Sequence, residues 1–156
     1  MRTFLLVLHV LGAVVALGFS LSYAFWVRRG EADGVHGRAF ALRTISWIDS
    51  HVTTPAFISQ LVTGLLLVAT IDWDLLRQAW LELSLGIYVL LTVLAMTVYG
   101  PSFRRQREIA EAIASGEGDE TDYETASTKA TTWGAIVTVL TLVIVVLMVW
   151  KPALWS

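Results

Sequence analysis

The sequence predicts an all-α integral membrane protein, an antiparallel four-helix bundle whose helices all span the bilayer. Hydrophobic residues make up 56% of the 156 residues and charged residues 15%, and the apolar residues are gathered in long runs. Such runs are atypical of soluble domains and about as long as a helix that crosses a bilayer. Four runs with short connections fit a single membrane domain over residues 1–156 and leave no room for a further soluble domain.

Missing residue types and motifs narrow the possible chemistry. The chain has no cysteine, which excludes disulfides, thiolate metal sites, iron–sulfur ligands and haem attached through cysteine. Any metal or haem must be held by nitrogen, oxygen or thioether ligands. No basic patch interleaved with aromatic residues is present, so nucleic acid is not an expected partner. No phosphate-binding glycine loop or Ser/His/Asp arrangement is present either, so no catalytic residue is assigned.

The first predicted span covers residues 4–27 and is uncharged apart from His9. It is longer than the apolar part of a signal peptide, and Arg28 and Arg29 follow it in place of a small-residue cleavage site, so we expect it to be retained. Small residues at every fourth position predict a helix-packing face, and His9 points within about 60° of it. We therefore expect the imidazole to face protein. The small residues are Gly12, Ala16, Ser20 and Ala24.

The second predicted span covers residues 45–70. Residues 30–37 before it are polar and rich in glycine, which predicts a loop, with the helix beginning near Arg38. Pro55 removes one backbone hydrogen bond and predicts a kink. Polar and small side chains at helical spacing predict an inward face on this span. Its residues are Asp49, Thr53, Ala56, Gln60, Thr63 and Gly64.

The third span is expected over residues 78–99. The connection before it, at residues 71–74, is short, so the second and third helices should be antiparallel neighbours. Gly100 and Pro101 are typical of a helix end, because glycine accepts unusual backbone angles and proline cannot continue a regular helix.

Residues 102–130 are charged and favour helix, which predicts a helical segment in the cytoplasm. Within it, Thr121 and Glu124 fit a capping box that would start the last helix. From there a helix can run unbroken through the fourth span, residues 131–150, until Pro152 closes it.

Positive charge is distributed unevenly between the two ends of the predicted bundle. By the positive-inside rule, the end with more Lys and Arg is cytoplasmic, which places both termini on the extracytoplasmic side. The basic residues of the cytoplasmic end are Arg28, Arg29, Arg38, Arg43, Arg104, Arg105, Arg107 and Lys129. Those of the other end are Arg2, Arg77 and Lys151.

Polar side chains inside a span are costly and are the first candidates for function. His9 allows three interpretations: a structural hydrogen bond between helices, a ligand of haem or metal, and proton or ion handling. By depth, Glu82 and Met148 share its half of the bilayer. Two arrangements follow: a His9–Glu82 hydrogen-bonded pair, or haem b bound by His9 with Met148 or no protein group opposite. Gln60 is expected to hydrogen-bond between helices.

Asp49 and His51 have plainer interpretations. Asp49 can pair with Arg43 or Arg28 near the cytoplasmic boundary. His51 points away from the polar face, which predicts an interfacial histidine. It also lies near the opposite end of the bilayer from His9, so the two histidines are a poor pair of axial ligands.

Motifs in the first, second and last spans occur in a recognisable order. They are LHVLGA at 8–13, Asp49 with TTPA at 53–56, Gln60 with TGL at 63–65, and MVWKP at 148–152. Over essentially the whole chain, these motifs resemble the bacterial integral membrane proteins grouped as domain of unknown function 2269. The resemblance implies a multi-pass protein of the bacterial cytoplasmic (inner) membrane and no particular activity. His51 stands where an apolar or aromatic residue is usual.

The opening of the first span is also similar, over that one helix, to copper resistance D proteins and to the haem-dependent protoporphyrinogen oxidase of bacteria. The equivalent histidine there is linked to copper or haem, which implies His9 as the ligand. The sequence therefore predicts a small membrane protein that binds haem b through His9 for redox chemistry or sensing. One alternative is a non-catalytic membrane subunit or stability factor, acting with a partner subunit or a second copy. Another is an ion or small-solute carrier working through His9, Glu82, Asp49 and Gln60.

Overall fold

The computed structural model describes residues 1–70 and 78–151, and all regular structure in these residues is helical. Four continuous helical stretches are long and apolar enough to cross a membrane, which confirms the predicted all-α membrane fold. The predicted connection at 71–74, Arg77 and Pro152 lie outside the described residues. The elements are α1 (Arg2–Ala32), α2 (Gly34–Ile48), the π-helical turn η1 (Asp49–Thr53), α3 (Thr54–Val68), α5 (Ala79–Leu94), the π-helical turn η2 (Ala95–Tyr99), α6 (Gly100–Ala114) and α7 (Glu120–Trp150).

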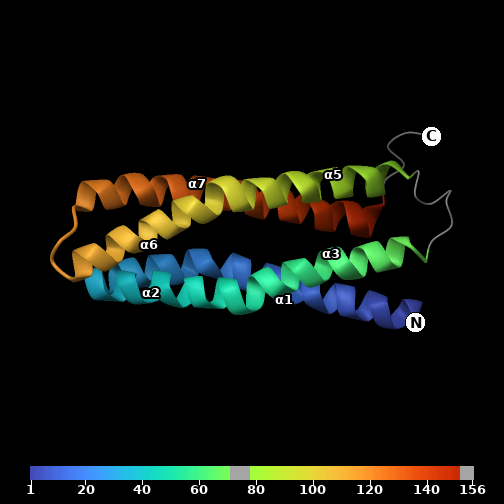
Figure 1. Ribbon diagram of the computed structural model, residues 1–156, viewed down its shortest axis with the longest axis horizontal. Coiled ribbons are helices and arrows are strands. Elements are labelled where there is room, and N and C mark those ends of the chain that lie inside the picture. The colour runs from blue at the N-terminus through green and yellow to red at the C-terminus, as the bar shows by residue number, and fades with distance from the viewer. Residues whose placement is uncertain (71–77, 152–156) are drawn as a thin grey trace.

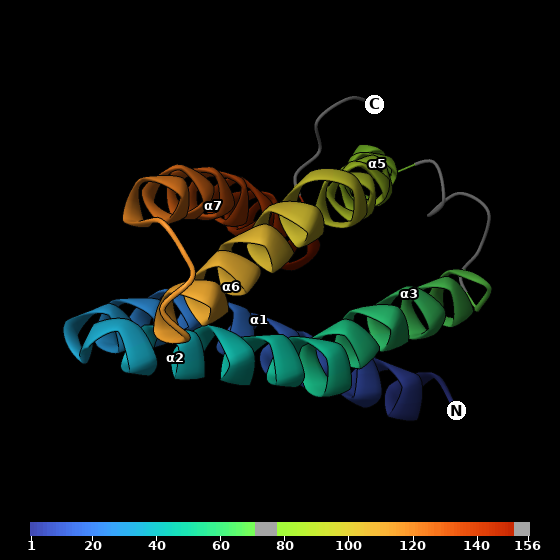
Figure 2. The same ribbon diagram turned by 60° about the vertical axis from the view of Figure 1, so that its left-hand side comes forward.

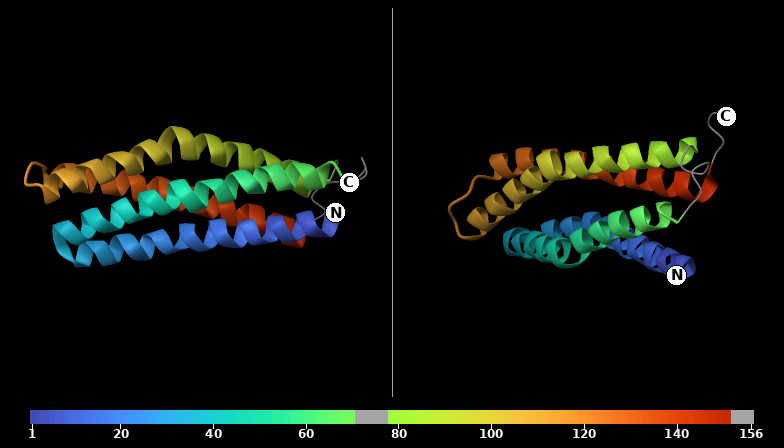
Figure 3. Two further views of the ribbon diagram at one scale, coloured as in Figure 1. Left: turned by 60° about the horizontal axis from the view of Figure 1, so that its bottom comes forward. Right: turned by 45° about the vertical axis from the view of Figure 1, so that its right-hand side comes forward.

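The helices pack as two hairpins, and consecutive long helices run in opposite directions (Figure 1). In the first hairpin α1 lies along α2 and α3, and in the second α7 lies along α5 and α6. Figure 2 shows the hairpins as two layers, which meet mainly where α2 contacts α6. The N-terminus and the ends of α3 and α7 lie at one end of the molecule, here called the terminal end (Figure 3). The turns at Asp33 and 115–119 lie at the other, here called the charged end.

The helices are longer than a bilayer is thick. The stretch from α5 to α6 has 36 residues, which is about 54 Å at 1.5 Å per residue, against about 30 Å of hydrocarbon. The surplus carries the charged sequence of α6 and of the start of α7. The charged end therefore projects out of the membrane.

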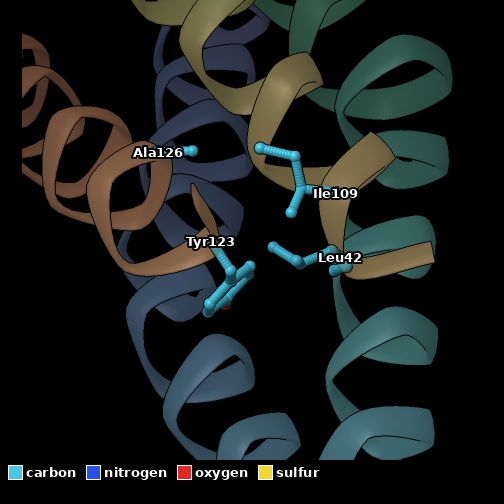
Figure 4. Close-up of a cluster of buried hydrophobic side chains, with 5 residues drawn as sticks. Leu42, Ile109, Tyr123 and Ala126 are labelled. Atoms are coloured by element: carbon cyan, nitrogen blue, oxygen red, sulfur yellow. The ribbon is translucent and has the colours of Figure 1, made fainter. Parts of the chain in front are cut away.

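The buried apolar cluster lies in this projecting part (Figure 4). It joins Leu42 of α2, Ile109 and Ala110 of α6, and Tyr123 and Ala126 of α7. Within the spans, by contrast, many large apolar side chains lie exposed on the bundle surface, where they can face lipid. Burial of apolar surface is favourable only against water, so the cluster forms where the helices leave the bilayer.

The loop predicted at residues 30–37 is wrong, because only Asp33 separates α1 from α2. The glycines of this stretch serve close helix packing instead. A Cβ atom on Gly30 would come within 2.5 Å of the Ala41 Cβ. Among the glycines of residues 30–37, Gly34 alone has the positive φ that glycine tolerates, at +80°.

Both prolines within the described helices follow a π-helical turn. Pro55 comes after η1 and Pro101 after η2, each at the start of the next α-helix. A π turn adds one residue to the helix and can accommodate a proline that donates no backbone hydrogen bond. The helix end predicted at Gly100 and Pro101 is therefore wrong, and residues 79–114 form one continuous helix. At Pro55 the expected distortion takes the form of η1.

The last helix runs unbroken to Trp150, as predicted, but its cap differs. Asp119 caps it by accepting a hydrogen bond from the Thr121 backbone N–H at 2.7 Å, in place of the predicted capping box of Thr121 and Glu124. Aspartate is at least as good an N-cap as threonine, so the helix starts two residues earlier than the box would allow. Lys151, with φ 48°, ends it.

Candidate functional site

His9 lies on α1 and faces α3. Its ring is half-buried, and its Nδ1 atom lies 2.9 Å from Oγ1 of the buried Thr63. A Cβ atom on Gly64 would come within 3.3 Å of the His9 Cε1, so this glycine makes room for the ring. The imidazole therefore faces a neighbouring helix, as its position beside the small residues of α1 indicated.

The hydrogen bonds of Thr63 assign the tautomer of a neutral His9. The Thr63 hydroxyl donates its single proton to the Ser59 carbonyl at 2.6 Å. Its oxygen therefore accepts the Nδ1–H of His9, which leaves the Nε2 atom unprotonated. Within residues 1–70 and 78–151, the side-chain hydrogen bond of the ring is formed by Nδ1 and not by this Nε2. Its lone pair is available to a ligand.

Gln60 forms a second contact between the same helices. Its Nε2 donates to the backbone carbonyl of His9. Gln60 thus forms the interhelical hydrogen bond that the sequence predicted. A Cβ atom on Gly12 would come within 2.5 Å of this amide nitrogen. The small residue at position 12 thus gives the amide access to the α1 backbone.

A second polar cluster joins α1 to the π turn η1. The hydroxyl of Tyr23 lies 2.6 Å from the Thr53 Oγ1 and donates to the Asp49 Oδ1 at 3.5 Å. Asp49 thus lies against a tyrosine of α1, not in the expected pair with Arg43 or Arg28. The π turn widens the helix at this point, and the Asp49 carboxylate remains inside the hairpin.

Tyr23 is not among the predicted site residues, although the sequence contains a signal for it. His9, Ala16, Tyr23 and Gly30 follow one another at intervals of seven residues, which places them on one side of a helix. Ala16 is 1% exposed, Tyr23 is 8% exposed and Gly30 is buried. The four-residue repeat of small side chains therefore describes the buried side of α1 less well than this seven-residue repeat.

Within the described residues, no hydrogen bond joins His9 to Glu82, Met148 or His51. Glu82 is exposed in the first turn of α5, and its side chain has no hydrogen bond or ion pair in that part of the chain. Met148 is half-buried on α7 and has no described contact with His9. His51 is exposed and stacks on Trp47, with ring centroids 4.6 Å apart. A carrier path through His9, Asp49 and Glu82 therefore has no continuous chain of contacts here.

At the charged end, Arg38 joins α2 to α7. Its guanidinium forms two 2.8 Å hydrogen bonds to the Glu120 carboxylate and lies 3.9 Å from the centroid of the Tyr123 ring. The Tyr123 hydroxyl accepts from Gln106 at 3.2 Å and donates to Glu31 at 3.3 Å. Burial raises the pKa of Tyr123, so it stays a neutral donor, while Arg38 lowers the pKa of Glu120. This network ties α1, α2, α6 and α7 together outside the membrane.

Metal ions held by protein alone usually need three or four ligands. No group of three or more His, Cys, Asp or Glu side chains suited to a metal occurs among residues 1–70 and 78–151. His9 therefore offers a single nitrogen ligand, and the hydrogen bond to Thr63 orients its ring. One protein ligand suits a cofactor that itself supplies the other donor atoms to its metal.

The family comparison agrees with the helical architecture. Comparison with curated proteins and with solved structures finds no match. A family model described as predicted integral membrane protein (DUF2269) matches residues 3–152, nearly the whole chain. The chain therefore belongs to the DUF2269 family of predicted integral membrane proteins.

Proposed function

We propose that this membrane protein binds haem b through His9, for redox chemistry or sensing. The observation that carries the proposal is the hydrogen-bond relay from His9 Nδ1 through Thr63 to the Ser59 carbonyl. A histidine that ligates iron donates its other ring N–H to a fixed acceptor, which sets the tautomer and the ring orientation. His9 has this arrangement, with Nε2 as the ligand atom.

Haem b is favoured over a bare metal ion because its porphyrin supplies four nitrogen donors. One protein ligand is then enough, whereas a bare ion needs more ligands than the described residues gather around His9. The hairpins contact each other mainly through α2 and α6, towards the charged end. Nearer the terminal end fewer helix contacts join them, among them the 2.8 Å hydrogen bond that the Tyr88 hydroxyl of α5 donates to the Phe57 carbonyl of α3. A flat apolar ligand seated there would require less rearrangement of helix contacts than one near the charged end.

The visible spectrum of the protein purified from haem-replete cells tests the proposal. We expect a Soret band that disappears in His9→Ala and persists in the matched control His51→Ala, whose ring is exposed. In His9→Gly, added imidazole should restore the band by replacing the lost ligand. A colourless wild-type preparation that also fails to take up added haemin would exclude the proposal.

A second candidate function, a non-catalytic subunit that associates with another copy, is favoured by the outward face of α5. This face combines a carboxylate, a glycine whose added Cβ would meet nothing within 4 Å, and exposed apolar side chains. Small residues let a second helix approach closely. The residues are Glu82, Gly86, Val89, Val93 and Met96.

Differently tagged copies expressed in one cell test this second candidate. If α5 is the contact, Gly86→Leu should reduce co-purification of the two copies. Gly18→Leu, at an equally open glycine of α1, should leave it unchanged. Equal co-purification in wild type and Gly86→Leu would exclude the α5 face as the interface.

A further inference from the structure

A hollow of about 360 Å³ lies between η2, α6 and α7, on the opposite hairpin from His9. Its floor has short or buried side chains, notably Ser102 and Ala126, and the long side chains of Arg105 and Lys129 stand beside it. The volume is within the usual range of small-ligand sites. The complete lining is Thr97, Val98, Pro101, Ser102, Arg105, Ala126 and Lys129.

The two cations of the hollow have no acidic partner in the described part of the chain. Neither Arg105 nor Lys129 forms an ion pair or a side-chain hydrogen bond there, although three other arginines do form ion pairs. Both are exposed. Two like charges beside one hollow, whose lining includes no carboxylate, favour an anion between them.

The hollow lies at the level where the span ends. Val98 belongs to the last apolar turns of the α5–η2 helix, and Arg105 follows it by seven residues, which is about 10 Å along a helix. One end of the hollow therefore contacts apolar surface, and the other carries positive charge. A phospholipid has the same order, with acyl chains next to a charged phosphate.

Charge is ordered in the same way on three of the helices. On α1, α6 and α7, the basic residues lie nearer the apolar span than the acidic residues do. The basic residues are Arg28, Arg29, Arg104, Arg105, Arg107 and Lys129. The acidic residues beyond them are Glu31, Asp33, Glu108, Glu111, Glu117, Asp119, Glu120, Asp122 and Glu124.

We propose that this hollow binds the headgroup of an anionic glycerophospholipid, with the phosphate between Arg105 and Lys129. The apolar lining next to the cations favours a lipid over a soluble phosphate, because a free anion gains nothing from Val98 and Pro101. The site is independent of His9 and of any cofactor.

Lipid retention measured by native mass spectrometry tests the site, in the full chain purified with phosphatidylglycerol and phosphatidylcholine in equal amounts. Wild type should retain phosphatidylglycerol preferentially. The double variant Arg105→Gln/Lys129→Gln should retain on the order of tenfold less, since each basic residue near a membrane surface changes binding several-fold. Arg105→Lys/Lys129→Arg should retain it like wild type.

The matched control is Arg43→Gln/Arg104→Gln, which removes two exposed cations that do not line the hollow. It should leave phosphatidylglycerol retention unchanged. Equal loss in both double variants would mean a general charged belt and would overturn the site, as would equal retention of the two lipids by wild type. Displacement of phosphatidylglycerol by millimolar inorganic phosphate would overturn the lipid assignment in favour of a soluble anion.

Wild type alone gives a second measurement that does not depend on variant folding. Phosphatidylglycerol, but not phosphatidylcholine, should raise its melting temperature in detergent, because a ligand of the folded state stabilises it. High salt should remove this difference by screening exposed charges. An equal melting temperature in both lipids would contradict the proposal.

Discussion

Among single residues, Thr63 determines what His9 can do. A threonine on a helix commonly donates its proton to the carbonyl four residues back, as Thr63 does to Ser59. That bond turns the hydroxyl into an acceptor for the next group, here the His9 Nδ1–H. The imidazole is thus held by a neutral relay inside the span, and no buried ion pair is needed to fix it.

Thr63→Val removes this acceptor with little change in volume. We expect a loss of stability of roughly 0.5–1.5 kcal/mol, the range typical of interhelical hydrogen bonds in membranes. Thermal unfolding in detergent measures it. Thr132→Val is the matched control, because the exposed Thr132 hydroxyl hydrogen-bonds, within the described residues, only to the Thr128 carbonyl of its own helix. Equal effects of the two substitutions would mean that the contact with His9 contributes nothing.

The polar residues of the site were predictable from the sequence only in part. His9 and Gln60 stand out because they interrupt apolar runs, and their helical spacing indicates the face on which they lie. Their partners depend on the rotation of one helix against another, which spacing along one helix does not determine. This is why a His9–Glu82 pair and an Asp49–Arg43 pair were as reasonable as the observed contacts with Thr63 and Tyr23.

At the scale of elements, one glycine and one proline have structural roles other than those that composition predicts. Gly30 belongs to a stretch whose composition suggests a loop, but it is buried where α1 and α2 touch. Pro101 suggests a helix end, but η2 carries the helix past it. Composition rules describe isolated helices in water. In a tight hairpin, glycine is favoured because it lets two helices approach closely, and a π turn can accommodate proline.

Gly30→Ala should be clearly destabilising, since the added methyl would meet the Ala41 Cβ at 2.5 Å and two backbone atoms at 3.0 and 3.3 Å. Such overpacking typically costs about 1–3 kcal/mol. Gly86→Ala is the control, because its added Cβ meets nothing within 4 Å. Glycine lowers helix stability by about 0.5–1 kcal/mol relative to alanine, so Gly86→Ala should be neutral or stabilising in the same unfolding measurement. A neutral Gly30→Ala would contradict the close packing of α1 and α2.

The Arg38–Glu120 pair between α2 and α7 predicts a pH dependence of stability. Arg38 lowers the pKa of Glu120 in the folded protein below its usual value of 4.5. A carboxyl group with a lowered pKa stabilises the fold above its unfolded pKa, and this contribution disappears as pH falls through the folded pKa. The difference in melting temperature between wild type and Arg38→Gln should therefore be constant above about pH 5 and should shrink below about pH 4.

Arg104→Gln serves as the control for this measurement, because Arg104 is exposed and has no ion pair in the described part of the chain. Its difference from wild type should not follow the Glu120 titration. A difference between wild type and Arg38→Gln that stays constant down to pH 3 would show that the Glu120 charge does not contribute.

Considered as a whole molecule, the protein has two ends that meet different surroundings. At the charged end, water drives the apolar cluster around Leu42 and Tyr123 together, and Arg38 links the helices around it. Towards the terminal end, each helix faces lipid, and contacts depend on small residues and single hydrogen bonds such as that of Gln60. The two hairpins therefore contact each other most extensively at the charged end.

The uneven charge of the two ends predicts how the protein is oriented in the membrane. Basic residues are concentrated at the charged end, so the positive-inside rule places this end in the cytoplasm and both termini outside it. The chain has no cysteine, so single substitutions at exposed positions give a clean test with a membrane-impermeant maleimide. In intact bacterial cells with a permeable outer envelope, Thr70→Cys, two residues after α3, should be labelled directly. Glu117→Cys, in the turn before α7, should be labelled only after the cells are lysed. The reverse pattern would invert the topology and would place the proposed lipid site in the outer leaflet.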